Sequence, residues 1–323
     1  MASPNATFTE MVTTTLRNHP TQVADNVSKH NALWRRLSTG GRIKKLSGGY
    51  EIVRPLEYAE NSTYQRYSGY DALNIGASDV FTAAKYDWVQ SAVHVTASGR
   101  EMRMNSGKEQ LIDLAASRTK NALKTAANNM SLDIYSSGAL SNQMSGLGAI
   151  ITADGTGTVG GITSSGSSNT WWNNQYQEMS GTGTYADIKN DMIKLWVKCV
   201  RGNDKPQLIV SSNDLWSAYW NALTSLQRYN DNVSEATAGF DSLKFQTADV
   251  IHDLETTNFT ATQEVMYFIN SDYLEVVVHR DANWSTLDEK MSVNQDAVVI
   301  PVIWQGQLCC SNRSLQGRLI DVS

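Results

Sequence analysis

The segment from residue 49 to residue 97 constrains the fold most, because it holds two strand-like runs but too little apolar surface for a core of its own. The first run covers residues 49–58 and the second covers residues 81–95. Within the second run, valines alternate with aromatic and polar residues at the period of two that a pleated strand requires. A lone two-stranded ribbon is only marginally stable in water. We therefore expect either the rest of the chain or another subunit to cover this one.

The connector between the two runs is polar but carries aromatic side chains. Residues 60–76 contain Tyr64, Tyr67 and Tyr70 among Asn, Ser, Thr and Gly, which predicts a solvated, amphipathic connector. Pro55 in the first run has no N–H to donate to a neighbouring strand. We therefore expect the first run to be an edge strand.

The composition is that of a globular protein with a polar but weakly charged surface. The chain has 323 residues, 41% of them hydrophobic and 18% charged, and is long enough to bury a substantial core. Its net charge of −5 argues against a dedicated nucleic-acid binder, whose domain is normally basic. The first 54 residues nevertheless carry eight Lys and Arg against three Asp and Glu, a net charge of +5 on a body of −10. Such a basic segment could dock on a neighbour's acidic surface, face a polyanion, or simply be solvated.

The cysteines and the chain start indicate where the protein folds. Cys199, Cys309 and Cys310 are an odd number without framework spacing, which favours a reducing compartment and predicts no disulfide. Cys199 lies on the apolar face of a predicted helix, and of the adjacent pair we expect one side chain to point inward and one outward. The start lacks the charged and apolar regions of a secretory signal, and no apolar stretch is long enough to span a bilayer, so we expect no membrane association.

Hydrophobic periodicity predicts a chain that mixes helices and strands. Residues 5–48 read as an extended arm with a short helical stretch, and residues 108–136, without Pro or Gly, as a long helix. Residues 138–183 are rich in Gly, Ser and Thr and should form loops and short strands, including a strand-like run over 149–151. The remaining predicted elements are a helix over 185–200, a strand over 207–211, a helix over 215–229, and strands over 265–269, 274–280 and 297–304.

No pattern in the sequence predicts a catalytic residue, a cofactor site or a metal site. Residues 155–160 match G-x-G-x-x-G, but a dinucleotide site needs a following helix, and a glycine-rich surface loop is the better account. The five histidines are scattered without zinc spacing, and neither a G-x-S-x-G elbow nor a Walker lysine is present. The carboxylates between residues 272 and 289 are attributed to solvated turns. Trp171 and Trp172 are attributed to packing or to an interface.

The order of these segments resembles the major capsid proteins of tailed bacteriophages, which have the α+β HK97-type fold. The stretch from residue 306 to residue 319 also resembles the C-termini of such proteins. The resemblance covers nearly the whole chain and implies an N-terminal arm (1–48), a projecting E-loop β-hairpin (49–98), the spine helix of a P-domain (99–146), an A-domain (147–273), P-domain strands (274–312) and a C-terminal segment that returns to the A-domain (313–323).

The resemblance implies a structural protein rather than an enzyme. Hexamers and pentamers of the chain would tile an icosahedral shell that encloses double-stranded DNA, as part of a virion assembled in the host bacterial cytoplasm. No acidic or heptad-patterned segment precedes the arm, so the resemblance implies a separate scaffolding protein. It also implies a portal and non-specific contact with the packaged DNA, and it leaves open whether a decoration protein binds the outer face.

The resemblance also assigns contacts between subunits. In the E-loop the implied contact residues are Tyr58, Tyr64, Tyr67, Tyr70, Lys85, Tyr86 and Trp88. In the arm they are Trp34, Arg35, Arg36, Lys44 and Lys45. Some members of the family crosslink an E-loop lysine to a neighbour's asparagine; here the only lysine between Lys45 and Lys108 lies in a strand rather than at the tip, and we predict no crosslink.

Two other functions stay open. An encapsulin-like bacterial compartment shares the same fold and would differ in holding cargo enzyme instead of DNA. An enzyme that uses the glycine-rich loop as a binding site is the other alternative, and it would retain a cofactor on purification.

Overall fold

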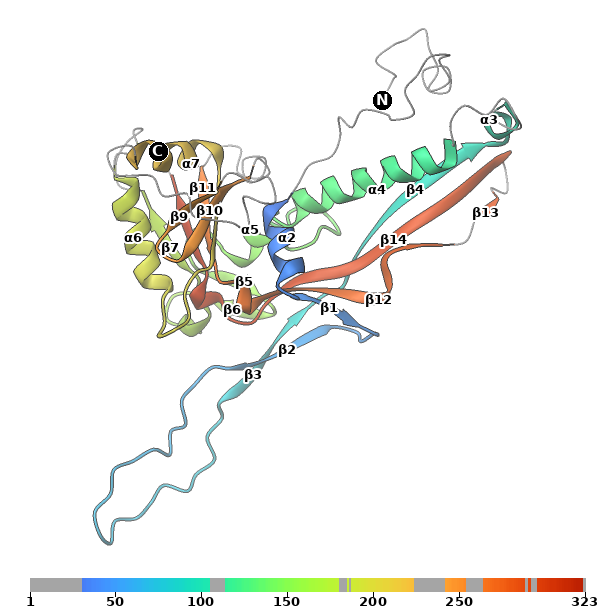
Figure 1. The fold of residues 1–323 in the computed structure, drawn as a ribbon. Coiled ribbons are helices and arrows are strands. Elements are labelled where there is room, and N and C mark those ends of the chain that lie inside the picture. Colours follow the sequence, from blue (N-terminus) through green and yellow to red (C-terminus); the bar gives the residue numbers. More distant parts are fainter. Residues whose placement is uncertain are drawn as a thin grey trace.

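The structure is a computed structural model, in which one sheet is long, a second lies beside it, and a ribbon projects away from both (Figure 1). It describes residues 31–104, 114–179, 185, 187–223, 242–253, 264–287, 290–291 and 295–321. The described chain mixes α-helices and β-strands, as the sequence predicts.

The elements have the following bounds. The α-helices are α2 (Ala32–Thr39), α3 (Gly99–Met104), α4 (Leu114–Asp133), α5 (Leu147–Ile150), α6 (Ile188–Cys199) and α7 (Asn213–Ala222). The 3-10 helices are η2 (Thr170–Trp172), η3 (Ser271–Tyr273) and η4 (Arg313–Leu315). The strands are β1 (Ile43–Leu46), β2 (Ile52–Glu57), β3 (Phe81–Tyr86), β4 (Val89–Ser98), β5 (Gly157–Val159), β6 (Ile162–Ser164), β7 (Gln175–Glu178), β8 (Leu208–Ser211), β9 (Ser242–Phe245), β10 (Ala248–His252), β11 (Val265–Ile269), β12 (Leu274–Thr286), β13 (Lys290–Met291), β14 (Ala297–Cys310) and β15 (Gly317–Ile320).

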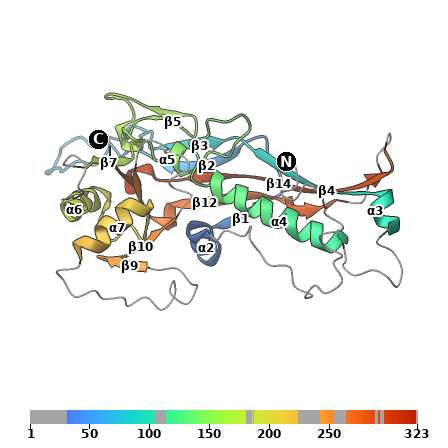
Figure 2. The same cartoon turned by 90° about the horizontal axis from the view of Figure 1, so that it is seen from above.

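The long sheet is built from two unusually long strands. Its order is β1-β12-β14-β13, and β4 also pairs with β14. Strand β12 has 13 residues and β14 has 14, against a usual length of about 5–6. Helix α4 runs along β4 and covers one face of the sheet (Figures 1 and 2), where it buries Ala122, Ala126 and Met130. The predicted long helix is confirmed over its described part, and residues 105–113 lie outside the described residues.

The second run of the segment from 49 to 97 divides into two strands, which corrects the prediction of a single one. Strand β3 pairs with β2. The chain turns away from the ribbon at Trp88, and the next strand, β4, pairs along its whole length with β14. The buried side changes at the break, because β3 buries even-numbered Ala84 and Tyr86, while β4 turns odd-numbered residues such as Val95 inward. The predicted alternation of the valines is confirmed within β4, but this strand belongs to the long sheet.

The six-stranded sheet has the order β7-β15-β11-β8-β10-β9. Helices α6 and α7 lie together over one face, where Ile188, Leu195 and Leu215 pack against the strands (Figure 2). The predicted helix, strand and helix over residues 185–229 are confirmed as α6, β8 and α7, although residues 224–241 lie outside the described residues. The opposite face joins a core that continues through α5 and α2 to the long sheet.

The segment that precedes the ribbon is part of the body from Ala32 onward, which corrects the prediction of an extended arm over residues 5–48. Asn31 caps α2 by accepting a hydrogen bond from the Trp34 amide at 2.8 Å. Leu33 and Leu37, one helical turn apart, are completely buried. Strand β1 then pairs in parallel with β12. Residues 1–30 lie outside the described residues.

Two smaller expectations are wrong. The strand-like run at 149–151 overlaps the short helix α5. Cys309 and Cys310 are both buried, because β14 is covered on both faces where it ends. Cys199 lies in the core as predicted, and burial raises the pKa of all three thiols to about 12.

Candidate subunit interface

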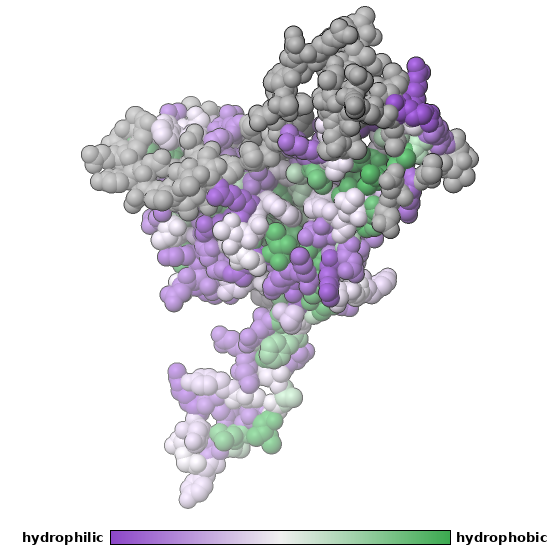
Figure 3. Space-filling view, turned by 45° about the vertical axis from the view of Figure 1, so that its right-hand side comes forward, coloured by the Kyte–Doolittle hydropathy of each residue, from purple (hydrophilic) through white to green (hydrophobic). Residues whose placement is uncertain are grey.

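The ribbon, residues 50–87, is the part of the described chain that stands farthest from the body (Figures 1 and 3). Strands β2 and β3 form its base, in a register that runs from Ile52 opposite Tyr86 to Glu57 opposite Phe81. Residues 58–80 form its tip. A few polar contacts shape the tip, such as the hydrogen bond from Gln65 Nε2 to the Ala72 carbonyl at 2.9 Å.

The tip exposes large apolar and aromatic side chains to solvent. Tyr64 is 80% exposed, Tyr67 is 64% exposed and Ile75 is 94% exposed, and Tyr70 and Leu73 are exposed as well. Figure 3 shows apolar residues, in green, on the part of the ribbon that extends away from the body. Exposed apolar patches of this kind mark interaction surfaces, because a monomeric protein normally keeps them small.

The base of the ribbon, in contrast, is covered by the chain itself. Ile52, Leu56, Ala84 and Tyr86 are buried in the main core. The Tyr86 hydroxyl donates a hydrogen bond to the Cys310 carbonyl at 2.8 Å and accepts one from the Cys310 amide at 3.2 Å. Burial raises the pKa of Tyr86 well above its ordinary value. The assignment of Tyr86 to contacts between subunits is therefore wrong.

Three more predicted ribbon contacts have partners within this chain. The Tyr58 ring packs on Trp171 with centroids 5.6 Å apart. The Trp88 indole donates to the Gly49 carbonyl at 2.9 Å and meets the edge of His279. Lys85 is exposed, and its ammonium group lies 3.6 Å from Glu51. Of the residues predicted as ribbon contacts, Tyr64, Tyr67 and Tyr70 are therefore the ones that lie exposed at the tip, away from the body.

The residues predicted as arm contacts also fall into two groups, those that pack or pair within this chain and those that are exposed. Trp34 is half-buried against the chain's own core, and Lys44 lies 2.5 Å from Glu275. Arg36 is also half-buried. Arg35 and Lys45 are exposed, so their contact with a neighbouring subunit stays a prediction.

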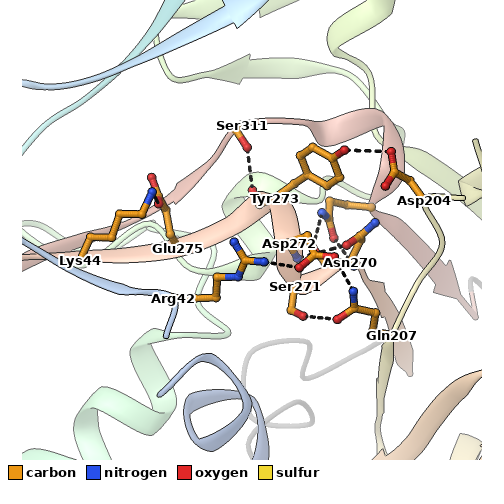
Figure 4. Close-up of polar contacts among 11 residues, drawn as sticks. Arg42, Lys44, Asp204, Gln207, Asn270, Ser271, Asp272, Tyr273, Glu275 and Ser311 are labelled. Carbon is orange, nitrogen blue, oxygen red and sulfur yellow. Dashed lines mark hydrogen bonds and ion pairs between the residues drawn. The ribbon is translucent and has the colours of Figure 1, made fainter. Parts of the chain in front are cut away.

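A polar cluster fastens the two sheets together where the chain passes from β11 to β12 (Figure 4). Arg42, just before β1, pairs with Asp272, which also accepts a hydrogen bond from Gln207 Nε2 at 2.5 Å. Gln207 in turn accepts from the Ser271 hydroxyl at 2.6 Å. The Tyr273 hydroxyl donates to Asp204 at 2.8 Å. Hydrogen bonds and an ion pair therefore connect the junction to several neighbouring segments, which favours motion of the two sheets as one rigid unit.

A second ion-pair group holds the ribbon base to β12. Glu275 pairs with Lys44 and with Arg54 of β2, so one carboxylate links the ribbon to both β1 and β12. The attribution of Asp272 and Glu275 to solvated turns is wrong for this reason. Sequence reasoning missed these three ion pairs, since the paired residues lie more than 200 residues apart along the chain.

The glycine-rich segment forms a small hairpin, β5–β6, and the element that follows it is the three-residue 3-10 helix η2, not an α-helix. This confirms the expected short strands and loop. Among the residues that the structure describes, no group of three His, Cys, Asp or Glu side chains could hold a metal ion. None of the helices in the described ranges is long and apolar enough to cross a membrane.

Comparison of the sequence with family models and with curated proteins finds no match, but the fold has clear counterparts among solved structures. A chain of the cyanophage A-1(L) capsid superposes with a TM-score of 0.67 at 15% identity, over 94% of this chain and 96% of that one. A chain of the capsid of Myoviridae phage XM1 gives 0.59 at 8% identity, over 95% and 97%. The chain has the HK97-type capsid fold. An encapsulin from Synechococcus elongatus shares this fold, with a TM-score of 0.57 at 8% identity over 92% of this chain and 91% of that one.

Proposed function

We propose that the chain is the major capsid protein of a tailed bacteriophage and assembles through hexamers and pentamers into an icosahedral shell around double-stranded DNA. The observation that carries this proposal is the ribbon tip, which exposes tyrosines and aliphatic side chains on a projection with no core of its own. The likeness of nearly the whole chain to phage capsid chains supports it.

In this proposal the parts of the chain take the roles of the HK97-type fold. The ribbon is the E-loop, and β4 is assigned to the P-domain along with α4, β12 and β14, since it pairs with β14. The six-stranded sheet with α6 and α7 is the A-domain, which the C-terminal strand β15 joins. Residues from Ala32 onward do not belong to an arm in this proposal, because α2 and β1 pack in the body.

The tip supplies the contact that joins neighbouring subunits. The base is fixed by the buried Tyr86 and by the Arg54–Glu275 pair, so the tip is presented at a defined place. Apolar burial stabilises such a contact by roughly 25 cal/mol per Å² before the costs of association are subtracted. Many weak, identical contacts of this kind can close a shell.

Other partners follow from the same proposal. A separate scaffolding protein, a portal and a decoration protein would act with the shell, which is assembled in the host bacterial cytoplasm and ends in the virion. Arg35 and Lys45 are exposed basic residues that suit either a neighbour's acidic surface or packaged DNA. We propose no covalent crosslink, since Lys85 lies in β3 beside Glu51 and not at the tip.

An encapsulin-like compartment is the second candidate, because an encapsulin shares the fold. The two differ in content: phage shells enclose DNA and encapsulins enclose protein cargo. The hypothesis that the glycine-rich loop is a nucleotide site is not supported by the hairpin geometry. A hairpin whose strands pair with each other presents no helix N-terminus to a phosphate.

Removal of the tip tests the proposal. The Tyr58 amide donates to the Val80 carbonyl at 3.0 Å, so an Asn-Gly turn in place of residues 59–79 closes the ribbon as a short hairpin. We expect this variant to be folded and to form no closed shells by electron microscopy, while the full chain forms shells. Normal shells from the shortened variant would overturn the proposal.

A further inference from the structure

The ribbon is held at its base by another small element, the hairpin β5–β6. Both are two-stranded, and neither belongs to the two large sheets. The Lys85 amide on the outer side of β3 donates a hydrogen bond to the Gly160 carbonyl at 2.9 Å, which joins the two elements through their backbones.

The contact at Gly160 leaves no room for a side chain. A Cβ there would lie 2.8 Å from the Ala84 Cβ and 3.1 Å from Tyr86 Cζ, where ordinary contact begins at 3.4 Å. The Ala84 Cβ is fixed to the backbone and Tyr86 is held by Cys310, so neither can turn aside without moving β3. Gly160 also has φ +60°, whereas the adjacent Gly161, with φ +73°, has no atom within 4 Å of its own Cβ position.

A second contact lies farther along the ribbon. The Tyr58 ring, where the tip begins, packs on Trp171 in the short helix that follows the hairpin. Trp171 in turn packs on the buried Trp172, with centroids 5.4 Å apart. The ribbon is thus supported at two separate points, one on β3 and one directly after the end of β2, and two contacts restrict its rotation more than one does.

The hairpin itself is anchored in the body. The Trp172 indole donates to the Val159 carbonyl at 3.0 Å. The buried guanidinium of Arg313 donates to the Trp172 carbonyl at 3.0 Å, to the Ile150 carbonyl at 2.8 Å and to Asn174 Oδ1 at 2.9 Å. A rigid support therefore runs from the C-terminal part of the chain to the hairpin and from there to the ribbon.

We propose that the hairpin β5–β6, through Gly160 and the neighbouring Trp171, sets the direction in which the ribbon leaves the body and thereby the curvature of the assembled shell. The part concerning the shell rests on the proposed function. From Ala84 to Tyr70 at the middle of the tip, 14 residues along the chain, the ribbon spans at most roughly 46 Å at about 3.3 Å per residue. A small rotation forced at Gly160 is therefore amplified to several ångströms where the tip meets a neighbour.

The test measures the ribbon direction in the full-length chain, kept dissociated, so that it does not depend on assembly. Spin labels on Ala77→Cys at the tip and Asn203→Cys on the body report the distance by pulsed electron resonance, and the three native thiols are buried and stay unlabelled. Gly160→Ala should shift or broaden the distance distribution by several ångströms. Gly161→Ala, which has a similar backbone conformation in open space, should leave the distribution as in the parent.

A second pair of variants tests the contact between Tyr58 and Trp171, which can be removed without introducing backbone strain. Tyr58→Ala should broaden the distribution, and Tyr64→Ala, which removes a side chain that is 80% exposed at the tip, should not. Unchanged distributions in both Gly160→Ala and Tyr58→Ala would overturn the proposal, and if Gly160→Ala does not fold, Tyr58→Ala decides alone. In assembly, Gly160→Ala should give shells of altered diameter and Gly161→Ala shells of parental diameter. If the parent forms no shells, the proposed function fails, while the distances still decide the role of the hairpin.

Discussion

The tip tyrosines offer the most direct test of how subunits bind one another. We consider Tyr64→Ala combined with Tyr67→Ala. Both side chains are mostly exposed in the isolated chain, so their removal should change the free energy of unfolding by no more than about 0.5 kcal/mol. Their removal should still weaken assembly, because each presents an aromatic surface for burial against a neighbour.

The size of the effect follows from the area involved. An aromatic side chain buries on the order of 150 Å² or more, and burying half of that contributes about 2 kcal/mol for each tyrosine. Ordering each side chain costs about 1 kcal/mol, which leaves about 2 kcal/mol for the pair. Since about 1.4 kcal/mol corresponds to a factor of ten, the threshold concentration for assembly should rise about thirtyfold.

Light scattering measures the assembly threshold, and thermal unfolding of the dissociated chain measures its stability. Tyr86→Phe is the matched control: it removes the hydroxyl that bonds to both Cys310 backbone groups, and should cost about 1–3 kcal/mol of stability because a buried N–H loses its acceptor. An unchanged threshold in the tip variant, or a loss of its stability as large as in the control, would refute the reasoning.

Three further predictions concern the body of the subunit. Arg313→Met should lower the free energy of unfolding by about 2–4 kcal/mol, because the buried carbonyls of Ile150 and Trp172 lose their donor, and denaturant titration that finds no loss would contradict this role. A thiol reagent should modify Cys199, Cys309 and Cys310 only as fast as the chain unfolds, since burial raises the pKa of each to about 12; rapid modification of the native chain would count against it. The hydrogen bond from Arg118 lowers the pKa of Glu101 from 4.5 to about 2, so this pair stabilises the fold above about pH 4.5 and the contribution disappears as the pH falls toward 2. Acid titration of Glu101→Gln should lack that part of the pH dependence, and an identical acid profile would refute it.

The periodic elements could be predicted from the sequence because their signal is local. Helices α4, α6 and α7 and strands β8, β11, β12 and β14 all follow patterns visible within 10 to 20 residues. The break between β3 and β4 was missed, although the apolar residues change from even to odd positions between Ala84 and Val89, and this change of parity is a usable signal.

The parts that depend on distant residues could not be predicted. The ion-pair partners of Asp272 and Glu275 come from the first 54 residues, and no periodic pattern connects them. The need for glycine at position 160 arises from β3, more than 70 residues earlier. For the candidate interface, the contacts of the tip tyrosines stay a prediction, and these residues are exposed. Tyr86 was grouped with them although it is buried, because burial of the ribbon base depends on the end of β14.

The central claim is that the ribbon tip completes its contacts on another copy of the chain. Electron cryomicroscopy of the particles formed by the purified full-length protein tests this most directly. The account predicts closed icosahedral shells in which the tip, with Tyr64, Tyr67 and Tyr70, is buried against a neighbouring subunit. Particles in which the tips remain in solvent, or a protein that stays a small oligomer at every concentration, would contradict it.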